Sequence, residues 1–313
     1  MIENEAEIRP AGGLSTGALA PLYGWYRWTY RFCRTKPLGA IGGFITVVLI
    51  LIAILAPVIA PYHPKDINGP KDTLGVSINE AVHLPPQAQF PFGTDHVGRD
   101  LLSRVIHGAR ISLYVGFGSV ILGVSLGATL ALVTTYAGKY VDLSFQRLVD
   151  AMMALPGLII ALAIVAVIGS SMQNVILAIV IGMVAPLVRT VRSQVLTLKE
   201  TDYVLAARAV GASSKRIIFR HIAPNCFAVV LVIATYYLGL AITIEASLSF
   251  LGVGVPPDVP SWGGILKRAA EEHVRTAPHV AIFPGVAIFI VVLGFNLLGD
   301  ALRDVFDPKL RGR

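Results

Sequence analysis

The longest uncharged stretch of the chain is AMMALPGLIIALAIVAVIGSSMQNVILAIVIGMVAPLV, residues 151–188. Its 38 residues are about twice the 20 or so that one helix needs to cross the hydrocarbon layer of a bilayer. The polar cluster Gly169–Asn174 interrupts the stretch and is suited to a tight turn. The stretch therefore predicts two antiparallel transmembrane helices, near 151–168 and 175–190.

Four further segments lack charged side chains over a length that spans a membrane. They predict transmembrane helices near 38–60, 111–137, 224–244 and 278–298. Only 14% of the 313 residues are charged and 55% are hydrophobic, whereas soluble domains carry about 25% charged residues. The sequence therefore predicts an all-α integral membrane protein with six transmembrane helices.

Composition also excludes several classes of protein. The dominance of apolar residues excludes a disordered chain, and two cysteines, Cys33 and Cys226, are too few for a disulfide framework. The net charge of +7 raises the question of nucleic acid, but an excess of Lys and Arg is typical of the cytoplasmic loops of membrane proteins. We therefore expect a lipid bilayer, and no nucleic acid, as a partner.

The distribution of Lys and Arg predicts the orientation. With the N-terminus inside, 18 of the 26 Lys and Arg residues are cytoplasmic, which favours both termini in the cytoplasm. The predicted organisation is then a cytoplasmic segment with an interfacial helix, a first transmembrane helix, an outer segment, a five-helix core and a cytoplasmic tail. Their ranges are 1–36, 37–61, 62–110, 111–300 and 301–313.

The cytoplasmic loop 191–222 connects the fourth and fifth predicted spans and has the pattern of a folded segment. Thr201 or Asp202 is suited to cap a helix that continues to Val210, and Gly211 follows where a left-handed C-cap is expected. A second helical turn is expected to start at Ser213 or Ser214. A short helix with small residues on one face fits the groove of another protein, and a helix that only lies on the membrane surface is the alternative.

The same loop carries a family resemblance. Residues 202–212, DYVLAARAVGA, and 217–225, IIFRHIAPN, resemble the cytoplasmic loop of ATP-binding-cassette (ABC) importer permeases. The family signature reads Glu-Ala-Ala, three residues, Gly, and then Leu-Pro. This chain matches it at Ala206, Ala207, Gly211 and Pro224. It departs with Leu205 in place of the Glu and Ala223 in place of the Leu.

Two other motifs narrow the resemblance to one branch of the family. Residues 92–104, FGTDHVGRDLLSR, precede the second predicted span, and FLGVGVPP with PSWG beyond it, within 250–263, follows the fifth. Both resemble the dipeptide/oligopeptide/nickel branch, and specifically its shorter, second permease subunit. The resemblance covers about residues 35–310.

The resemblance implies a type I ABC importer permease fold with a cytoplasmic coupling helix, in the cytoplasmic (inner) membrane of a bacterium or archaeon. It implies four partners: a paralogous second permease, two cytoplasmic ATPase subunits that bind ATP and Mg, and an extracytoplasmic substrate-binding protein. Di- or oligopeptides are the implied substrates, with nickel, glutathione or a similar solute as alternatives. The residues implied to contact the ATPase subunits are Tyr203, Ala206, Ala207, Gly211, Ala212 and Pro224.

The chain itself is expected to be non-catalytic and to hold no cofactor. It contains no Gly-x-x-x-x-Gly-Lys-Ser/Thr loop, and the spacings of its outer histidines match no compact metal site. A secondary transporter or channel would need charges or broken helices at mid-membrane, and a membrane enzyme would need clustered acid and base groups. The predicted span interiors show neither pattern.

Two polar positions near the outer surface carry separate expectations. Thr94 or Asp95 is expected to cap a helix on which Asp100 and Arg104 form an i, i+4 pair. Glu245 is expected at the end of the fifth span, where an acid needs a partner or water. It is either interfacial or a candidate residue of the pathway or outer gate.

Overall fold

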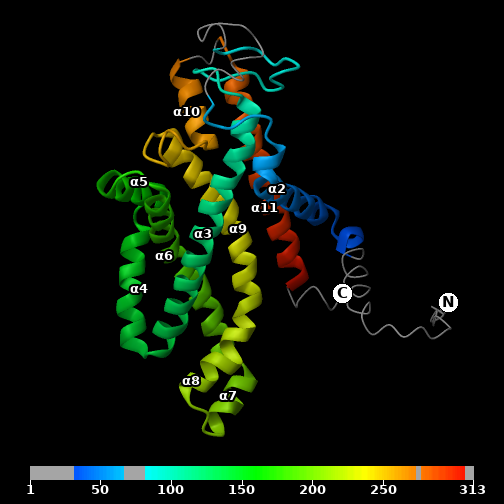
Figure 1. The fold of residues 1–313 in the computed structure, drawn as a ribbon. Helices are drawn as coiled ribbons and strands as arrows, with labels where there is room; N and C mark the ends of the chain where they lie inside the picture. The colour runs from blue at the N-terminus through cyan, green and yellow to red at the C-terminus, as the bar shows by residue number, and fades with distance from the viewer. Residues whose placement is uncertain (1–31, 67–81, 273–275, 307–313) are drawn as a thin grey trace, which may run out of the picture.

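The computed structural model describes residues 32–66, 82–272 and 276–306, and within these ranges the regular structure is helical, with one isolated bridge between Thr94 and Asp100. Five helices there are long and apolar enough to cross a membrane, and a sixth span results if one bent helix pair counts as a single crossing. The predicted all-α membrane architecture is confirmed (Figure 1). The predicted N-terminal interfacial helix lies outside the described residues.

The five long helices are α2 (Pro37–Ile59), α3 (Leu101–Tyr136), α6 (Met172–Lys199), α9 (Ala223–Phe250) and α11 (His279–Phe306). Except for α2, each continues beyond the uncharged segment that predicted it. An uncharged segment marks the hydrocarbon layer, whereas a helix continues into the polar layer for as long as its backbone groups find partners.

The start of α3 shows how such an extension is stabilised. Asp100 is its N-cap, and its carboxylate accepts a hydrogen bond from the backbone N–H of Ser103 at 2.7 Å. The expected cap at Thr94 or Asp95 is therefore wrong. Asp95, rather than Asp100, pairs with Arg104, at 3.4 Å from its Nε.

The third predicted span differs most from expectation. The chain forms α4 (Lys139–Met153) and α5 (Gly157–Ile168), and their axes are bent by 82°. Pro156 causes the break, because it has no N–H and disfavours a helical conformation at Leu155. The expectation of one straight helix over 151–168 is wrong.

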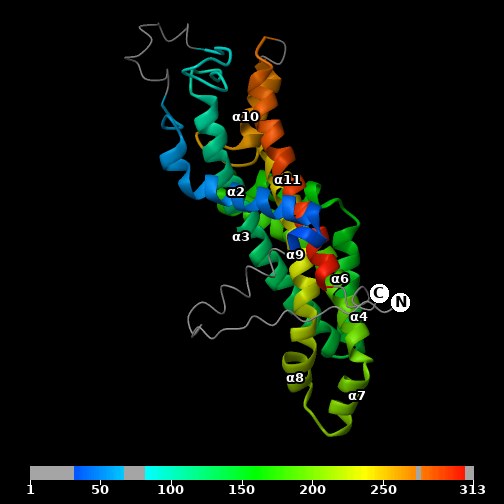
Figure 2. The same ribbon diagram turned by 90° about the vertical axis from the view of Figure 1, so that its right-hand side faces the viewer.

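Glycines bring the long helices close together. A Cβ on Gly127 of α3 would lie 2.4 Å from Leu187 Cδ2 of α6, and one on Gly42 of α2 would lie 2.6 Å from the backbone N of Leu298 of α11. At Gly42 the neighbour is backbone, which cannot move aside, and such close approaches increase van der Waals contact between helices in a membrane. Figure 2 shows α2 lying across α3 and α11, with which it is in contact.

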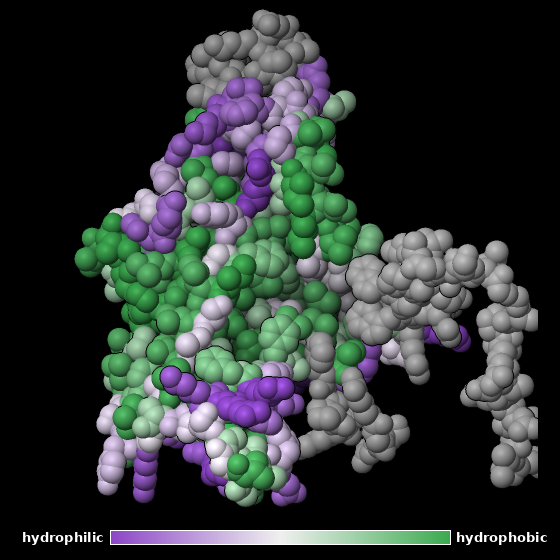
Figure 3. Space-filling view, turned by 60° about the horizontal axis from the view of Figure 1, so that its bottom comes forward, coloured by the Kyte–Doolittle hydropathy of each residue, from purple (hydrophilic) through white to green (hydrophobic). Residues whose placement is uncertain are grey.

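The molecule has two polar ends separated by a broad hydrophobic surface. At one end, α10 (Trp262–Glu272) packs beside the 82–100 loop, and Phe92 stacks on Phe283 of α11 with ring centroids 3.9 Å apart. At the opposite end lie α7 (Asp202–Ala209) and α8 (Ser214–Ile217) (Figure 1). Figure 3 turns this second end toward the viewer and shows hydrophilic residues gathered below the hydrophobic surface.

Candidate coupling surface

The segment containing α7 and α8, residues 201–217, projects beyond the end of α6 (Figure 1). The chain turns after Lys199, and the Thr201 hydroxyl donates to the carbonyl of Leu198 at 2.6 Å. Thr201 is the N-cap of α7, and Asp202 places a negative charge in the first turn, where the helix dipole favours it. The helix starts where it was predicted to start, although the Thr201 side chain makes no capping hydrogen bond. We refer to residues 201–217 as the α7–α8 segment.

The end of α7 is a Schellman motif. The backbone N–H of Gly211 donates to the carbonyl of Arg208, and that of Ala212 donates to the carbonyl of Ala207, both at 3.0 Å. Gly211 adopts φ +81°, the left-handed conformation expected of it from the sequence. A Cβ at this position would meet no atom within 4 Å, so the requirement for glycine comes from the backbone conformation and not from space.

A π-helical turn joins α8 to α9. Ser213 caps α8 by accepting a hydrogen bond from the N–H of Arg216, and residues Ile218–Ile222 then form the π-helix. Pro224 follows in the first turn of α9. Because its ring has no N–H and crowds the carbonyl four residues earlier, a widened turn at this point keeps the helix continuous. Residues Ser214–Phe250 consequently form one helical run.

Buried side chains hold the α7–α8 segment in place. Val204 of α7 is fully buried, as is Ile222 of the π-helical turn, and Ile217 of α8 is 2% exposed. All three belong to the same hydrophobic core as Val191 and Val195 of α6. The segment is therefore packed against the membrane-spanning helices and is not an independent surface helix.

The exposed side chains of the segment and of the turn that follows it include several large apolar groups. Val210 is 85% exposed and Phe219 is 74% exposed, and Leu205 is also exposed. Four basic side chains surround them in the sequence and are exposed as well: Arg208, Lys215, Arg216 and Arg220. Exposed apolar side chains with a polar surround are characteristic of surfaces that bind another protein.

Most of the predicted coupling residues lie together in this segment. Tyr203 is exposed, with its ring 6.4 Å from that of His221, and Ala206 is exposed beside it. Ala207 and Ala212 are half-buried at the Schellman motif, where Gly211 is exposed.

Pro224 lies apart from the others, exposed at the base of α9. The exposed apolar side chains of Val210 and Phe219 were not among the predicted coupling residues. Their only signal was an apolar side chain in a basic loop.

Glu245 occupies a different place from the one expected. The fifth span was predicted to end at 244, but α9 continues to Phe250, so Glu245 lies inside the helix. Its side chain is fully buried between α9 and α3 and accepts hydrogen bonds from Ser112 Oγ at 3.2 Å and Ser249 Oγ at 2.9 Å. These bonds supply partners for the buried acid, and its role in the pathway stays a prediction.

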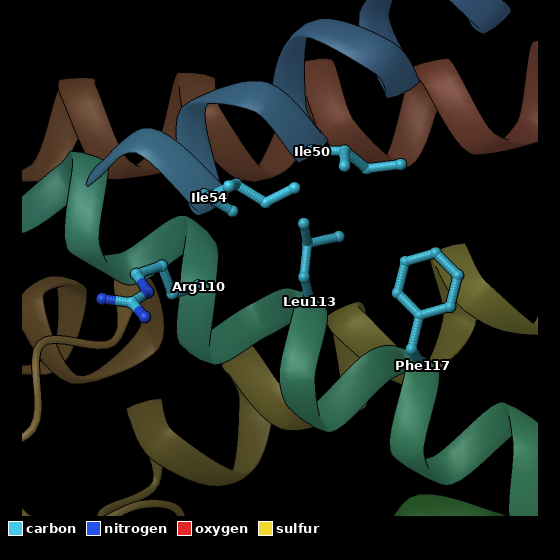
Figure 4. Close-up of a pocket in the computed structure, with 6 residues that line it drawn as sticks. Ile50, Ile54, Arg110, Leu113 and Phe117 are labelled. Atoms are coloured by element: carbon cyan, nitrogen blue, oxygen red, sulfur yellow. The ribbon is translucent and has the colours of Figure 1, made fainter. Parts of the chain in front are cut away.

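A groove of about 460 Å³ between α2 and α3 is a weaker candidate for a solute site. Its walls are Ile50, Ala53, Ile54, Leu113 and Phe117 (Figure 4). Arg110 is its only charged lining residue. The groove therefore lacks the converging polar groups that a polar solute needs.

Comparison with known proteins identifies the relatives of the chain. Residues 120–312 match the family model described as binding-protein-dependent transport system inner membrane component. Residues 25–86 match the model described as the N-terminal TM domain of oligopeptide transport permease C.

Two relatives match over nearly their whole length. The chain is 40% identical to the dipeptide transport system permease protein DppC of Alkalihalophilus pseudofirmus, over 91% of this chain and 90% of the relative. It is also 40% identical to the glutathione transport system permease protein GsiD of Pectobacterium atrosepticum, over 92% of each.

A solved structure supports the fold. One chain of an inward-facing structure of the MetNI methionine ABC transporter superposes with a TM-score of 0.55, over 66% of this chain and 98% of that one. At 19% identity this likeness concerns the fold alone. Together with the family match, it confirms the predicted type I importer permease fold.

Proposed function

The chain belongs to the family of binding-protein-dependent transport system inner membrane components, and from this premise we propose that it forms half of the pathway of an ATP-driven importer of short peptides. It is an ABC importer permease of the dipeptide/oligopeptide/nickel branch. Relatives named for dipeptide and glutathione transport support a peptide substrate, since glutathione is itself a short peptide. Glutathione is the alternative substrate.

The observation that carries the proposal is the α7–α8 segment. It projects from the membrane-spanning helices, is anchored by buried side chains and leaves large apolar side chains exposed. We assign this surface to a cytoplasmic ATPase subunit, with Tyr203, Ala206 and Gly211 at the contact. Small side chains on α7 permit close approach to the groove of that subunit.

The remaining partners follow from the same proposal. A second permease completes the pathway, a second ATPase subunit docks on it, and an extracytoplasmic protein delivers the peptide. ATP and Mg are bound by the ATPase subunits, and this chain contributes no phosphate-binding loop to them. The chain therefore transmits the ATPase cycle without taking part in its chemistry.

Uptake by the reconstituted complex tests this function. The chain is co-expressed with its partner subunits, purified as a complex and placed in liposomes. Uptake of radiolabelled Ala-Ala and of glutathione is then measured in the presence of ATP or of ADP. We expect uptake with ATP only, and no photolabelling of the isolated chain by an ATP analogue. Uptake that persists without ATP and follows an ion gradient would instead identify a secondary transporter.

A further inference from the structure

A second cavity, of about 210 Å³, lies between the end of α9, the 251–261 loop and α10. This is the end of the molecule opposite the α7–α8 segment (Figure 1). The polar residues that line the cavity are Arg104, Ser249, Ser261, Lys267, Arg268 and Glu271. Pockets for drug-sized ligands begin at about 300 Å³, so this one suits a smaller group, the size of a single amino-acid residue.

The lining carries three cations against one acid. Lys267 and Glu271 lie 3.7 Å apart in an exposed i, i+4 pair, so this acid offsets one of the three cations. Arg268 directs its guanidinium at Nε2 of His96 at 2.6 Å. That ring nitrogen accepts the bond as a neutral group, so the positive charge of Arg268 is not balanced by it.

Arg104 forms the buried part of the cavity wall. It is only 3% exposed, and one of its terminal nitrogens donates to the carbonyl of Pro64 at 3.0 Å. Its Nε lies 3.4 Å from the Asp95 carboxylate but has no hydrogen-bond acceptor among the described residues.

Asp95 already has other partners. One oxygen accepts from Arg99 Nε at 2.7 Å, and the other accepts from the backbone N–H groups of Val97 and Arg99. A single carboxylate is thus shared by two guanidinium groups, while the nearby Asp100 caps α3. A buried cation that is incompletely paired favours the entry of an anion.

The cavity is held in shape by close packing. A Cβ on Gly263 would lie 2.1 Å from the carbonyl oxygen of Ala246, so α10 approaches α9 as closely as backbone permits. Trp262 is buried and donates from Nε1 to the carbonyl of Val105 at 2.9 Å. A site that is already ordered loses less conformational entropy when a ligand binds.

We propose that this cavity binds the carboxylate group of the transported peptide, through Arg104, Lys267 and Arg268. The inference rests on the proposed function and names a subsite for it. The C-terminal carboxylate is the one anionic group that every unmodified linear peptide carries, whatever its side chains. A guanidinium matches it with two parallel hydrogen bonds, so the site selects for a free C-terminus without reading sequence.

Binding of radiolabelled Ala-Ala to the purified full-length chain in lipid nanodiscs tests the proposal, with the uncharged Ala-Ala amide as the matched ligand. We expect Arg268→Gln and Lys267→Gln each to weaken Ala-Ala binding roughly tenfold, as expected for loss of a charge-assisted hydrogen bond. The amide should bind weakly to the parent and equally weakly to both variants. Arg110→Gln removes an exposed cation of α3 that lines the α2–α3 groove and not this cavity, and should bind like the parent.

The Arg104→Lys variant, which keeps the buried positive charge, provides a second measurement. Gel filtration checks that this variant folds. It should bind Ala-Ala more weakly than the parent, because Lys cannot form the two parallel bonds. If Arg268→Gln and Lys267→Gln discriminate between Ala-Ala and its amide as the parent does, the proposal is wrong. It is also wrong if discrimination appears only when the substrate-binding protein is added, since that protein, and not the cavity, would then recognise the carboxylate.

Uptake by the complete transporter distinguishes a failure of the carboxylate subsite from a failure of the proposed transport function. Failure of the parent complex to import any peptide would overturn the proposed function. Import by the parent with unchanged carboxylate preference in the Arg268→Gln complex would overturn the carboxylate subsite alone.

Discussion

The requirement for glycine at position 211 is purely conformational, because Gly211 adopts φ +81° and no atom lies within 4 Å of where a Cβ would be. We expect Gly211→Val to insert and fold like the parent but to disturb the end of α7, since a left-handed conformation costs an L-residue about 1–2 kcal/mol. If that cost falls on docking, the affinity for the ATPase subunits drops roughly 5- to 30-fold and uptake falls with it. Co-purification of the ATPase subunits and peptide uptake measure the two effects.

Gly169 supplies the matched control for this change. It also has positive φ, at +91°, and open space around it, but it lies in the turn between α5 and α6. Gly169→Val should therefore leave ATPase binding unchanged. A Gly211→Val protein that assembles and transports like the parent would mean that the α7–α8 segment is an ordinary connection.

Single residues differ in how far the sequence predicts them. The conformation of Gly211 was predictable because all its determinants lie within a few positions, between the α7 helix and Ala212. The partners of Glu245 were not, because Ser112 lies 133 positions away and no local pattern relates the two.

At the scale of elements, the contact between α2 and α11 depends on one of two adjacent glycines. A Cβ on Gly42 would lie 2.6 Å from the backbone N of Leu298 and 2.7 Å from the carbonyl oxygen of Gly294, whereas one on Gly43 would lie 3.8 Å from a side-chain methyl. Because backbone atoms cannot rotate away, Gly42→Ala should push the helices apart at a cost of about 1–3 kcal/mol. We expect a clearly lower Tm in detergent for Gly42→Ala and an unchanged Tm for Gly43→Ala. Equal Tm values for the two variants would contradict this packing.

Helix boundaries were the least predictable elements. Uncharged segments of the sequence mark each of the long helices but end with the hydrocarbon layer, and α3 starts ten residues before its predicted first residue. Pro156 was visible in the sequence as a helix breaker, yet the apolar run continues through it without a charge. Hydropathy therefore located the membrane-embedded chain without revealing that it bends by 82°.

The whole molecule presents two polar ends, and the proposed function requires that the end with the α7–α8 segment be cytoplasmic. In a chain whose native cysteines have been replaced, a membrane-impermeant thiol reagent added from outside should label Cys introduced at Gln87 and spare Cys introduced at Ser213. Both positions are exposed, so access depends on the side of the membrane. The opposite labelling pattern would reverse the orientation and remove the α7–α8 segment from contact with ATPase subunits.

The family and its fold were predictable from three short motifs, because each motif is continuous in the sequence. The cavity beside α10 was not, since its walls come from α3, α9, the 251–261 loop and α10. Nothing in the sequence places Arg104 near Arg268, and only the packed structure brings the two cations to one wall.

The continuous helical run from Ser214 to Phe250 connects the two ends of the membrane-spanning core, so a tilt at one end moves the other. Its 37 residues have a length of about 55 Å, with α8 at one end and Ser249, which lines the cavity beside α10, at the other. A tilt of about 5° at the base displaces the far tip by about 5 Å, which is comparable to one helical turn. The π-helical turn at Ile218–Ile222 interrupts the regular α-helical hydrogen bonding near the α8 end, so we expect the run to bend there before it bends within α9.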